Sequence, residues 1–310
     1  MALGTNHVTK TTADKFIPEI WSDEIIAAYK QNLVAANMFS KMAFKGKKGD
    51  TLHIPKPTRG SASVKAASTQ VTLIAATETE IQVLINKHYE YSRLIEDIVE
   101  TQALASLRKF YTDDAGYALA KQVDTDLIQL GRAVGSGTDY STSATATNAF
   151  IGSNGTTVYN STSSNAAALT DAAIRRSIQR LDDADVPMTD RCMIVPPSTR
   201  NTLMGLARFT EQAFVGDVGS SNTIRNGMIG DLYGVMSYVS TNADTAAGNS
   251  ATDRICLLAH KDAFVLAEQM GVRSQTQYKQ EYLGTLFTSD MLYGVAELRD
   301  SSAVALAVPA

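Results

Sequence analysis

Residues 96–134 read EDIVETQALASLRKFYTDDAGYALAKQVDTDLIQLGRAV, and this stretch decides the fold of the chain. It contains no proline and only two glycines, Gly116 and Gly131, so nothing in it forces a helix to end. At about 1.5 Å per residue such a helix runs for roughly 50 Å, well beyond an average globular helix. The sequence therefore predicts one long helix around which the rest of the chain is arranged.

The predicted helix has two apolar faces, rotated from each other by about a right angle. The two sets of residues are Leu104, Leu107, Tyr111, Ala115 and Ala118, and Leu119, Val123, Leu127 and Leu130. A heptad pattern is not sustained and the flanking sequences are typical of strands, which argues against a coiled coil. Two faces indicate two packing partners, so we interpret the helix as a spine against which sheets pack.

Composition excludes several classes of protein. The chain has 310 residues, a net charge of −4 and a pI of about 5.6, which gives no electrostatic basis for a dedicated nucleic-acid binder. Cys192 and Cys256 lie in apolar, strand-like runs, as expected for buried reduced thiols. No apolar stretch is long enough to cross a bilayer, and the first twenty residues lack the apolar core of a secretion signal. We therefore expect a protein that is made and kept in a cytoplasm.

The N-terminal region combines a polar arm with an apolar segment. Residues 1–15 are rich in threonine, and Trp21, the only tryptophan, follows them. Ser22 is a good N-cap for a helix whose apolar face includes Ile25 and Tyr29. A large apolar segment on a polar arm indicates docking, either on a partner or on the far side of the same subunit.

A long two-stranded excursion follows the arm. Residues 51–54 alternate between apolar and polar in a strand that is expected to break at Pro55, and residues 81–85 form the returning strand. Between the two strands the chain is small, polar and β-branched, with an apolar cluster only at residues 71–74. Such a hairpin has too little apolar surface to be stable alone, so it needs another surface to lie on.

After the spine the composition changes at residues 135–168, which are dominated by Gly, Ser, Thr, Asn and Ala. This change marks either a domain boundary or an exposed insertion. Thr170 then caps a helix, residues 191–195 read as a buried strand, and Pro197 begins another helix, which together form an α/β unit. Further strands are expected over residues 254–259 and 264–266, and a closing pair of strands over residues 293–308.

No catalytic, metal or cofactor motif stands out. The four histidines are His7, His53, His88 and His260. No two of them have the i, i+4 spacing of a helical metal site, and no GxSxG nucleophile motif occurs. Asp182, Asp183 and Asp185 lack the other ligands of a calcium loop. We therefore expect no catalytic, metal-binding or cofactor-binding residues and predict that the chain is not an enzyme.

The order of these parts resembles the major capsid protein of tailed bacteriophages, which has the α+β HK97-type fold. The resemblance covers nearly the whole chain and depends on the order of several short sequences. They are GDTLHIP at 49–55, KQVD at 121–124, DRCMIVPP at 190–197 and NGMIGDLYG at 226–234. Each sequence is weak evidence by itself, and their order and spacing together carry the identification.

The resemblance implies a division of the chain into the parts of that fold. They are an N-arm (1–40), an E-loop with flanking strands (41–90), a P-domain spine helix (91–134), an A-domain (135–250) with the insertion at 135–168, and the end of the A-domain with the returning P-domain strands (251–310). In such proteins the arm and the E-loop become buried on neighbouring subunits. The residues expected at these contacts are Trp21, Ile25, Tyr29, Lys56, Arg59, Lys65, Val71, Asn226 and Gly227.

The implied function is self-assembly into the icosahedral shell of a virion, built from hexamers and pentamers in the host cytoplasm. The shell encloses double-stranded DNA without sequence-specific binding, and it involves no membrane. The implied partners are a portal protein, a separate scaffolding protein and, in some members, a decoration protein. Some members also form isopeptide bonds between subunits. Lys56 and Lys65 are candidate lysines here, but no asparagine occurs in residues 96–134 or after Asn249, so we predict non-covalent contacts.

Three alternatives remain open from the sequence. An encapsulin-like cellular compartment shares the fold and would contain an enzyme instead of DNA. A surface-layer subunit would explain the Ser/Thr-rich stretch but requires an export signal. A cytoplasmic α/β enzyme would need a deep pocket that brings His260 and Asp262 together with a nucleophile.

Overall fold

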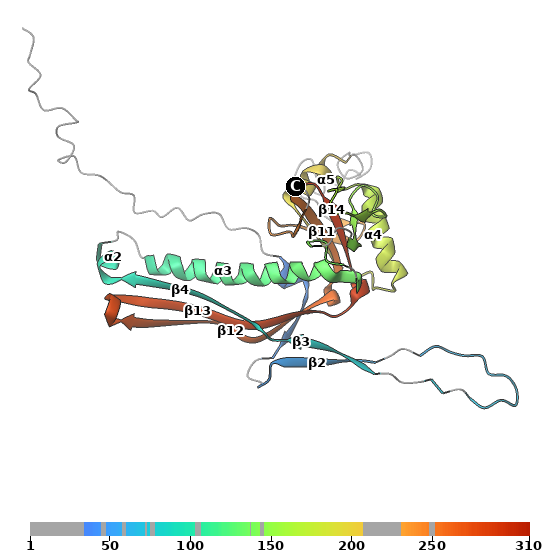
Figure 1. Ribbon diagram of the computed structural model, residues 1–310, viewed down its shortest axis with the longest axis horizontal. Coiled ribbons are helices and arrows are strands. Elements are labelled where there is room, and N and C mark those ends of the chain that lie inside the picture. Colours follow the sequence, from blue (N-terminus) through green and yellow to red (C-terminus); the bar gives the residue numbers. More distant parts are fainter. Residues whose placement is uncertain are drawn as a thin grey trace, which may run out of the picture.

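The computed structural model describes residues 34–44, 48–57, 60–71, 73–74, 78–102, 107–136, 138–142, 146–206, 231–247 and 252–310. This part of the chain forms a four-stranded sheet, an eight-stranded sheet and a two-stranded hairpin. The subunit is elongated, with a long helix lying along the four-stranded sheet and the eight-stranded sheet at one end (Figure 1).

The long helix is α3, which spans Leu107–Gln129 and continues into a 3-10 turn, η2 (Leu130–Ser136). The predicted spine is therefore confirmed, but its predicted start is wrong. Glu96 ends a strand, and a separate short helix, α2, covers Asp97–Gln102. Glu96 lies opposite Gly284 in the sheet, so tertiary pairing outweighs the helical preference of the sequence around it. Leu104 lies outside the described residues.

The spine packs differently along its length, as two faces would require. In its first half, Tyr111 stacks with Arg93 and Asp114 accepts a hydrogen bond of 2.9 Å from Tyr91, both on the neighbouring strand. In its second half, apolar side chains are buried in a core that both sheets and the N-terminal helix share. The spine residues in this core are Leu119, Val123, Leu127 and Ile128.

The four-stranded sheet has the order β1-β12-β13-β4. Its strands are β1 (Ser40–Ala43), β12 (Phe264–Lys279), β13 (Gly284–Glu297) and β4 (Lys87–Glu96). The 3-10 turn η4 (Gln280–Tyr282) connects β12 to β13, which pair antiparallel as the longest hairpin of the molecule. The sequence indicates only residues 264–266 of β12, because the distal half of this strand is exposed and polar and so lacks a burial pattern.

The eight-stranded sheet has the order β6-β5-β14-β11-β7-β9-β8, with β10 paired to β11. Its strands are β5 (Ala146–Ile151), β6 (Val158–Tyr159), β7 (Arg191–Val195), β8 (Asp231–Leu232), β9 (Val235–Val239), β10 (Thr245–Ala247), β11 (Thr252–His260) and β14 (Ala303–Val308). The two predicted closing strands are present on either side of Asp300, as β13 and β14, but they do not pair with each other. β13 and β14 belong to different sheets, because η5 (Asp300–Ser302) leads the chain from one sheet to the other.

Two helices accompany the eight-stranded sheet as the sequence predicts. α4 covers Asp171–Asp183, and the side chain of Thr170 caps it by accepting a hydrogen bond from the Ala173 amide. α5 covers Pro197–Met204, with proline at its first position. None of the helices in the described part of the chain is long and apolar enough to cross a membrane.

Two strands within residues 135–168, β5 and β6, belong to the eight-stranded sheet, so the stretch is not wholly an exposed insertion. β5 pairs parallel with β14, and Tyr140, Ala149 and Tyr159 are fully buried. The hydroxyls of Tyr140 and Tyr159 donate to Asp244 and Asp253 over 2.8 and 2.7 Å. The small residues between these anchors give the stretch its loop-like composition although its tyrosines are in the core.

Hydrogen bonds from tyrosine to aspartate recur between elements. Besides those of Tyr91, Tyr140 and Tyr159, Tyr278 donates to Asp97 and Tyr293 donates to Asp126. Burial, together with the neighbouring carboxylate of Asp126, raises the pKa of Tyr293 far above its usual range, so this hydroxyl stays a donor. Bonds of this kind to an ionised acceptor are stronger than neutral ones and connect helices to sheets inside the subunit.

Candidate subunit contact surfaces

The predicted excursion is a hairpin of β2 (Thr51–Lys56) and β3 (Thr79–Leu84), and its base is firmly held. The β2 strand runs through Pro55 instead of breaking there. Leu52 and Ile54 pack with Val83 and with β12 of the four-stranded sheet. Gly294 on β13 allows this close approach, because a Cβ there would lie 2.3 Å from the Leu84 carbonyl oxygen. The first residues of the hairpin are therefore part of the subunit core.

Beyond this base the hairpin leaves the subunit (Figure 1). All described residues from Lys56 to Glu80 are exposed. Val64, Val71, Leu73 and Ile74 expose between 62% and 101% of their surface. Burying a side chain of this size contributes about 1.5–3 kcal/mol, which the isolated subunit does not gain here. We define residues 57–78 as the hairpin tip.

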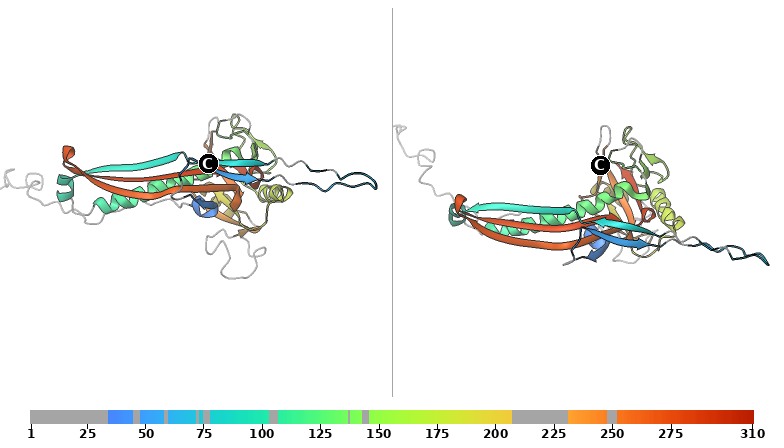
Figure 2. Two further views of the ribbon diagram at one scale, coloured as in Figure 1. Left: turned by 90° about the horizontal axis from the view of Figure 1, so that it is seen from below. Right: turned by 60° about the horizontal axis from the view of Figure 1, so that its bottom comes forward.

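A second apolar surface lies at the other end of the subunit, where β4 runs into α2 and β12 turns into β13. Its exposed side chains are Leu94, Ile98, Val99, Tyr278, Tyr282 and Leu283, which we define as the far-end cluster. Figures 1 and 2 place α2 and the hairpin tip at opposite ends of the molecule in three views. The elongated subunit therefore carries an uncovered apolar surface at each end.

The far-end cluster is absent from the residues that the sequence predicts at contacts. Its only local signal is the pair Tyr282 and Leu283 beside Gly284, where large apolar residues occupy a turn. Leu283 has a φ of 45°, in the left-handed region that disfavours a branched side chain, so this turn is held by the strand pairing around it. The sequence does not reveal that α2 lies beside this turn.

The predicted contact residues divide into two groups. Lys56, Lys65 and Val71 lie exposed on the hairpin, so the structure brings these three onto one element. The other six lie outside the described residues, namely Trp21, Ile25, Tyr29, Arg59, Asn226 and Gly227.

Between the two ends, the sheet face turned away from α3 carries a charged cluster. Tyr89, Tyr91 and Arg93 face the spine, so His88 and Glu90 face outward by strand alternation. On this outward face Arg273 donates to Asp290 from two nitrogens at 3.1 and 2.7 Å, and the His88 ring lies 3.2 Å away. These hydrogen bonds, chiefly that of Arg273, hold the pKa of Asp290 below its usual range.

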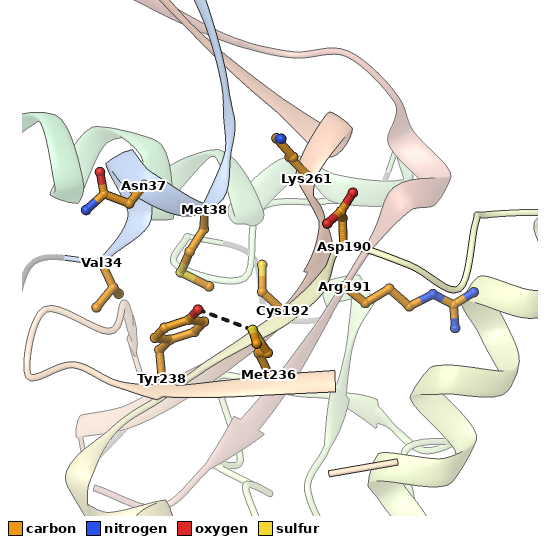
Figure 3. Close-up of a pocket in the computed structure, with 9 residues that line it drawn as sticks. All are labelled: Val34, Asn37, Met38, Asp190, Arg191, Cys192, Met236, Tyr238 and Lys261. Carbon is orange, nitrogen blue, oxygen red and sulfur yellow. Dashed lines mark hydrogen bonds between the residues drawn. The ribbon is translucent and has the colours of Figure 1, made fainter. Parts of the chain in front are cut away.

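A cavity of about 400 Å³ opens beside α1 (Ala35–Met38) and is shown in Figure 3. Met38, Cys192, Met236 and Tyr238 give it a mainly apolar and sulfur-rich wall. Burial raises the pKa of the Cys192 thiol to about 12, so it is not a nucleophile at neutral pH. The remaining lining residues are Val34, Asn37, Asp190, Arg191 and Lys261.

The histidine and aspartate that an enzyme was expected to use lie outside the lining of this cavity. His260 and Asp262 do not line it, and the ring of His260 instead accepts a hydrogen bond from the Asp262 amide. Among the described residues no group of three or more His, Cys, Asp or Glu side chains is placed to hold a metal ion. Among the described residues, the exposed apolar surfaces are the features that we take as candidate functional sites.

Comparison with known proteins agrees with this conclusion. Residues 39–306 match the family described as phage capsid protein. A structure from Mycobacterium phage Che8 is 23% identical, with a TM-score of 0.75, and the alignment covers 94% of this chain and 97% of that one. The capsid of cyanophage P-SCSP1u is 19% identical, with a TM-score of 0.75, covering 99% of this chain and 96% of that one.

The capsid of cyanophage Pam1 gives a TM-score of 0.73 at 15% identity and covers 99% of both chains. No curated protein sequence matches the chain. The similar structures confirm the predicted HK97-type fold, and the family match covers most of the chain. The chain therefore belongs to the phage capsid protein family.

Proposed function

We propose that the chain is the major coat subunit of a tailed phage and that its copies form an icosahedral shell around double-stranded DNA. The observation that carries this proposal is an elongated subunit with an uncovered apolar surface at each of two opposite ends. Monomeric proteins rarely leave such surfaces uncovered, and their usual occupant is another chain. The fold and the family make a second copy the natural occupant.

The placement of the two surfaces favours head-to-tail association. The hairpin tip and the far-end cluster are different surfaces, so a contact between copies joins unlike patches, and such contacts close into rings when the rotation allows. Hexamers and pentamers are rings of this kind. In our proposal the hairpin tip of one copy covers the four-stranded sheet of the next copy.

We assign the parts of the fold on the same basis. Residues 1–40 serve as the N-arm, 41–90 as the E-loop, 91–134 as the spine of the P-domain, 135–250 as the A-domain and 251–310 as its end and the returning P-domain strands. The E-loop assignment is supported by the exposed hairpin tip. The portal, scaffolding and decoration proteins remain expectations from the family and have no assigned surface.

The contacts between copies are proposed to be non-covalent, and the interior to hold DNA without reading its sequence. Lys56 and Lys65 are exposed on the hairpin, but the spine and the final 61 residues contain no asparagine to receive them. A net charge of −4 is consistent with a shell that does not bind the genome tightly. On a reducing denaturing gel, the coat protein of mature particles should run as a single monomer band, and a ladder of multimers would contradict this part of the proposal.

Electron microscopy tests the proposal directly. The expressed full chain, examined by negative stain, should form closed shells or sheets of rings. A matched variant in which Tyr282 and Val99 of the far-end cluster are both replaced by serine should fold equally well but assemble poorly. A monodisperse monomer at high protein concentration would overturn the proposal, and shells purified with an enzyme inside and no DNA would instead indicate a cellular compartment.

A further inference from the structure

One carboxylate connects three separate parts of the subunit. Asp124 lies in the second half of α3 and is fully buried. Its Oδ1 accepts hydrogen bonds from the backbone amides of Val34 and Ala35, at 2.9 and 2.7 Å. Its Oδ2 accepts from the side-chain amide of Asn242, at 2.9 Å. The spine, the start of the described N-terminal region and the eight-stranded sheet therefore meet at this side chain.

Asn242 is itself held in place, so the connection is rigid. Its side-chain amide also lies 3.0 Å from the Thr125 hydroxyl, and that hydroxyl lies 3.1 Å from Asn242 Oδ1. Its backbone amide donates to the Ser240 hydroxyl at the end of β9. The loop between β9 and β10 is thereby fixed to two successive residues of the spine.

The partners of the Asp124 carboxyl group among the described residues are three N–H groups, and none of them is a cation. Three N–H donors hydrogen-bond to this one buried carboxyl group. Hydrogen bonds to a carboxylate are strong and directional, so they restrict the orientation of each donor. Loss of the carboxylate leaves two backbone amides in the interior without acceptors, and a buried unpaired donor is costly. The orientation of residues 34 and 35 is therefore set by Asp124.

We propose that Asp124 is the positioning residue that fixes the direction in which residues 1–33 leave the subunit. Thirty-three residues span roughly 100 Å when extended, so the chain before Val34 can reach another copy. Asp124 therefore sets the side of the subunit from which the arm starts toward a neighbouring copy, and this consequence rests on the proposed assembly function.

Hydrogen–deuterium exchange of a peptide covering residues 31–38 tests the positioning role in the unassembled full chain. In Asp124→Ala we expect the amides of Val34 and Ala35 to exchange about tenfold faster or more, because they lose their acceptor. Asp124→Asn keeps an acceptor oxygen for these two amides but places its own amide nitrogen against that of Asn242. It should therefore accelerate exchange less than Asp124→Ala does, by about threefold.

The matched control is Asp126→Ala, two residues further along the same helix. Asp126 is also buried, but it accepts from Tyr293 and pairs with Lys87 instead of contacting the arm root. This variant should lower the stability of the subunit and leave exchange of residues 31–38 within about twofold of the parent. Equal acceleration by both alanine variants would show a general loss of stability and overturn the proposal.

If Asp124→Ala fails to fold, swapping the residue types at positions 124 and 242 tests the hydrogen bond between these two side chains. Asn242→Asp places two carboxylates against each other and should accelerate exchange of residues 31–38. The double variant Asp124→Asn with Asn242→Asp restores a donor facing an acceptor, with the charge moved to position 242, and should return exchange to near the parent rate. A double variant no slower than the single one would contradict the proposal.

The assemblies formed by each variant test separately whether the direction of the arm affects assembly. With exchange altered as expected, Asp124→Ala should give aberrant or open assemblies by negative stain, whereas Asp124→Asn should form shells. If the parent chain forms no shells, the proposed function fails while the exchange data still decide the role of Asp124. If exchange changes but Asp124→Ala shells are normal, the positioning of the arm does not direct assembly.

Discussion

The strand β14 and the hairpin tip both carry aliphatic side chains, and these side chains have opposite surroundings. β14 reads AVALAV, pairs with β5 on one edge and β11 on the other, and is buried at every position. The hairpin tip also carries valine, leucine and isoleucine, and those that the structure describes are largely exposed. Aliphatic side chains are therefore buried within the chain in β14, whereas those of the hairpin tip remain exposed and available to another chain.

This difference predicts that one region determines the stability of the subunit and the other determines its association with further copies. Side chains in the eight-stranded sheet hold the subunit together, so altering them should change unfolding. Side chains in the hairpin tip contribute nothing to the isolated subunit, so altering them should change only association. Four predictions test this separation, taken from the largest expected effect to the smallest.

The largest effect is expected from removing the hairpin tip. Replacing residues 57–78 with Asn-Gly joins Lys56 to Thr79, which already lie opposite each other, through a two-residue turn that suits a hairpin. We expect assembly to be abolished and the melting temperature to stay within about 2 °C of the parent, because the base keeps its packing. Calorimetry and sedimentation measure the two quantities, and shells of normal size would break the comparison.

The second prediction concerns a leucine in each region. Leu306→Ala in β14 creates a cavity at a fully buried position and should cost about 3 kcal/mol of unfolding free energy. Leu73→Ala in the hairpin tip should change that free energy by less than about 0.5 kcal/mol while raising the protein concentration needed for assembly. Urea titration and light scattering provide the measurements. A stability loss in Leu73→Ala would show that the tip is covered within its own subunit.

The third prediction concerns the ion pair that anchors residues 135–168 to the body. Arg132 donates to both oxygens of the buried Asp244 carboxylate at 2.7 Å, and Tyr140 also donates to it. Arg132→Ala leaves a buried carboxylate without its cation and should cost about 2 kcal/mol in urea unfolding, less than for a fully buried pair because Arg132 is partly exposed. Arg273→Ala, at the exposed guanidinium on the four-stranded sheet, is the control and should cost clearly less. Equal costs would contradict the difference in burial.

The smallest effect is a pH dependence at Glu297, where β13 ends at the joint between the sheets. Burial, assisted by Asp300, raises the pKa of Glu297 from 4.5 to about 7, and its Oε1 has no partner among the described residues. Because the folded chain binds this proton more tightly than the unfolded chain, the stability from this group is present below pH 4.5 and is lost as pH rises through 7.

Glu297→Gln should therefore be more stable than the parent by about 1 kcal/mol at pH 8 and almost equal to it at pH 5. Melting curves across this range measure the difference. Glu80→Gln is the matched control in the hairpin, where the carboxylate is exposed and a hydrogen bond from Gln82, with a further one from His53, lowers its pKa. If both variants showed the same change of stability with pH, the pH dependence could not be assigned to Glu297.

Several elements follow from local sequence. The spine, the Thr170 cap, the buried strand at 191–195 and the helix beginning at Pro197 are all confirmed, because proline-free helical spacing, a capping hydroxyl and a short apolar run act within a few residues. The hairpin and its shortage of apolar surface are visible in the same way. Three of the nine predicted contact residues, Lys56, Lys65 and Val71, are among the described residues of that hairpin.

The misjudged elements depend on distant partners. The distal half of β12 is polar and exposed, and only its pairing with β13 makes it a strand. Residues 135–168 have the composition of a loop, yet Tyr140 and Tyr159 are buried against Asp244 and Asp253, more than 90 residues away. The far-end cluster brings the neighbouring elements β4 and α2 beside η4, which lies about 180 residues further along the sequence.

The sequence by itself determined the long spine and the presence of a hairpin that cannot bury its own apolar side chains, because these depend on residue type and short-range periodicity. The class of fold followed from the resemblance of the order of the parts to a known family. Only the tertiary structure decided that β13 and β14 part into different sheets, that uncovered apolar surfaces face opposite ends, and that Asp124 holds the start of the arm. The physical reason is that strand pairing, burial and hydrogen-bond partners are properties of residues distant in sequence.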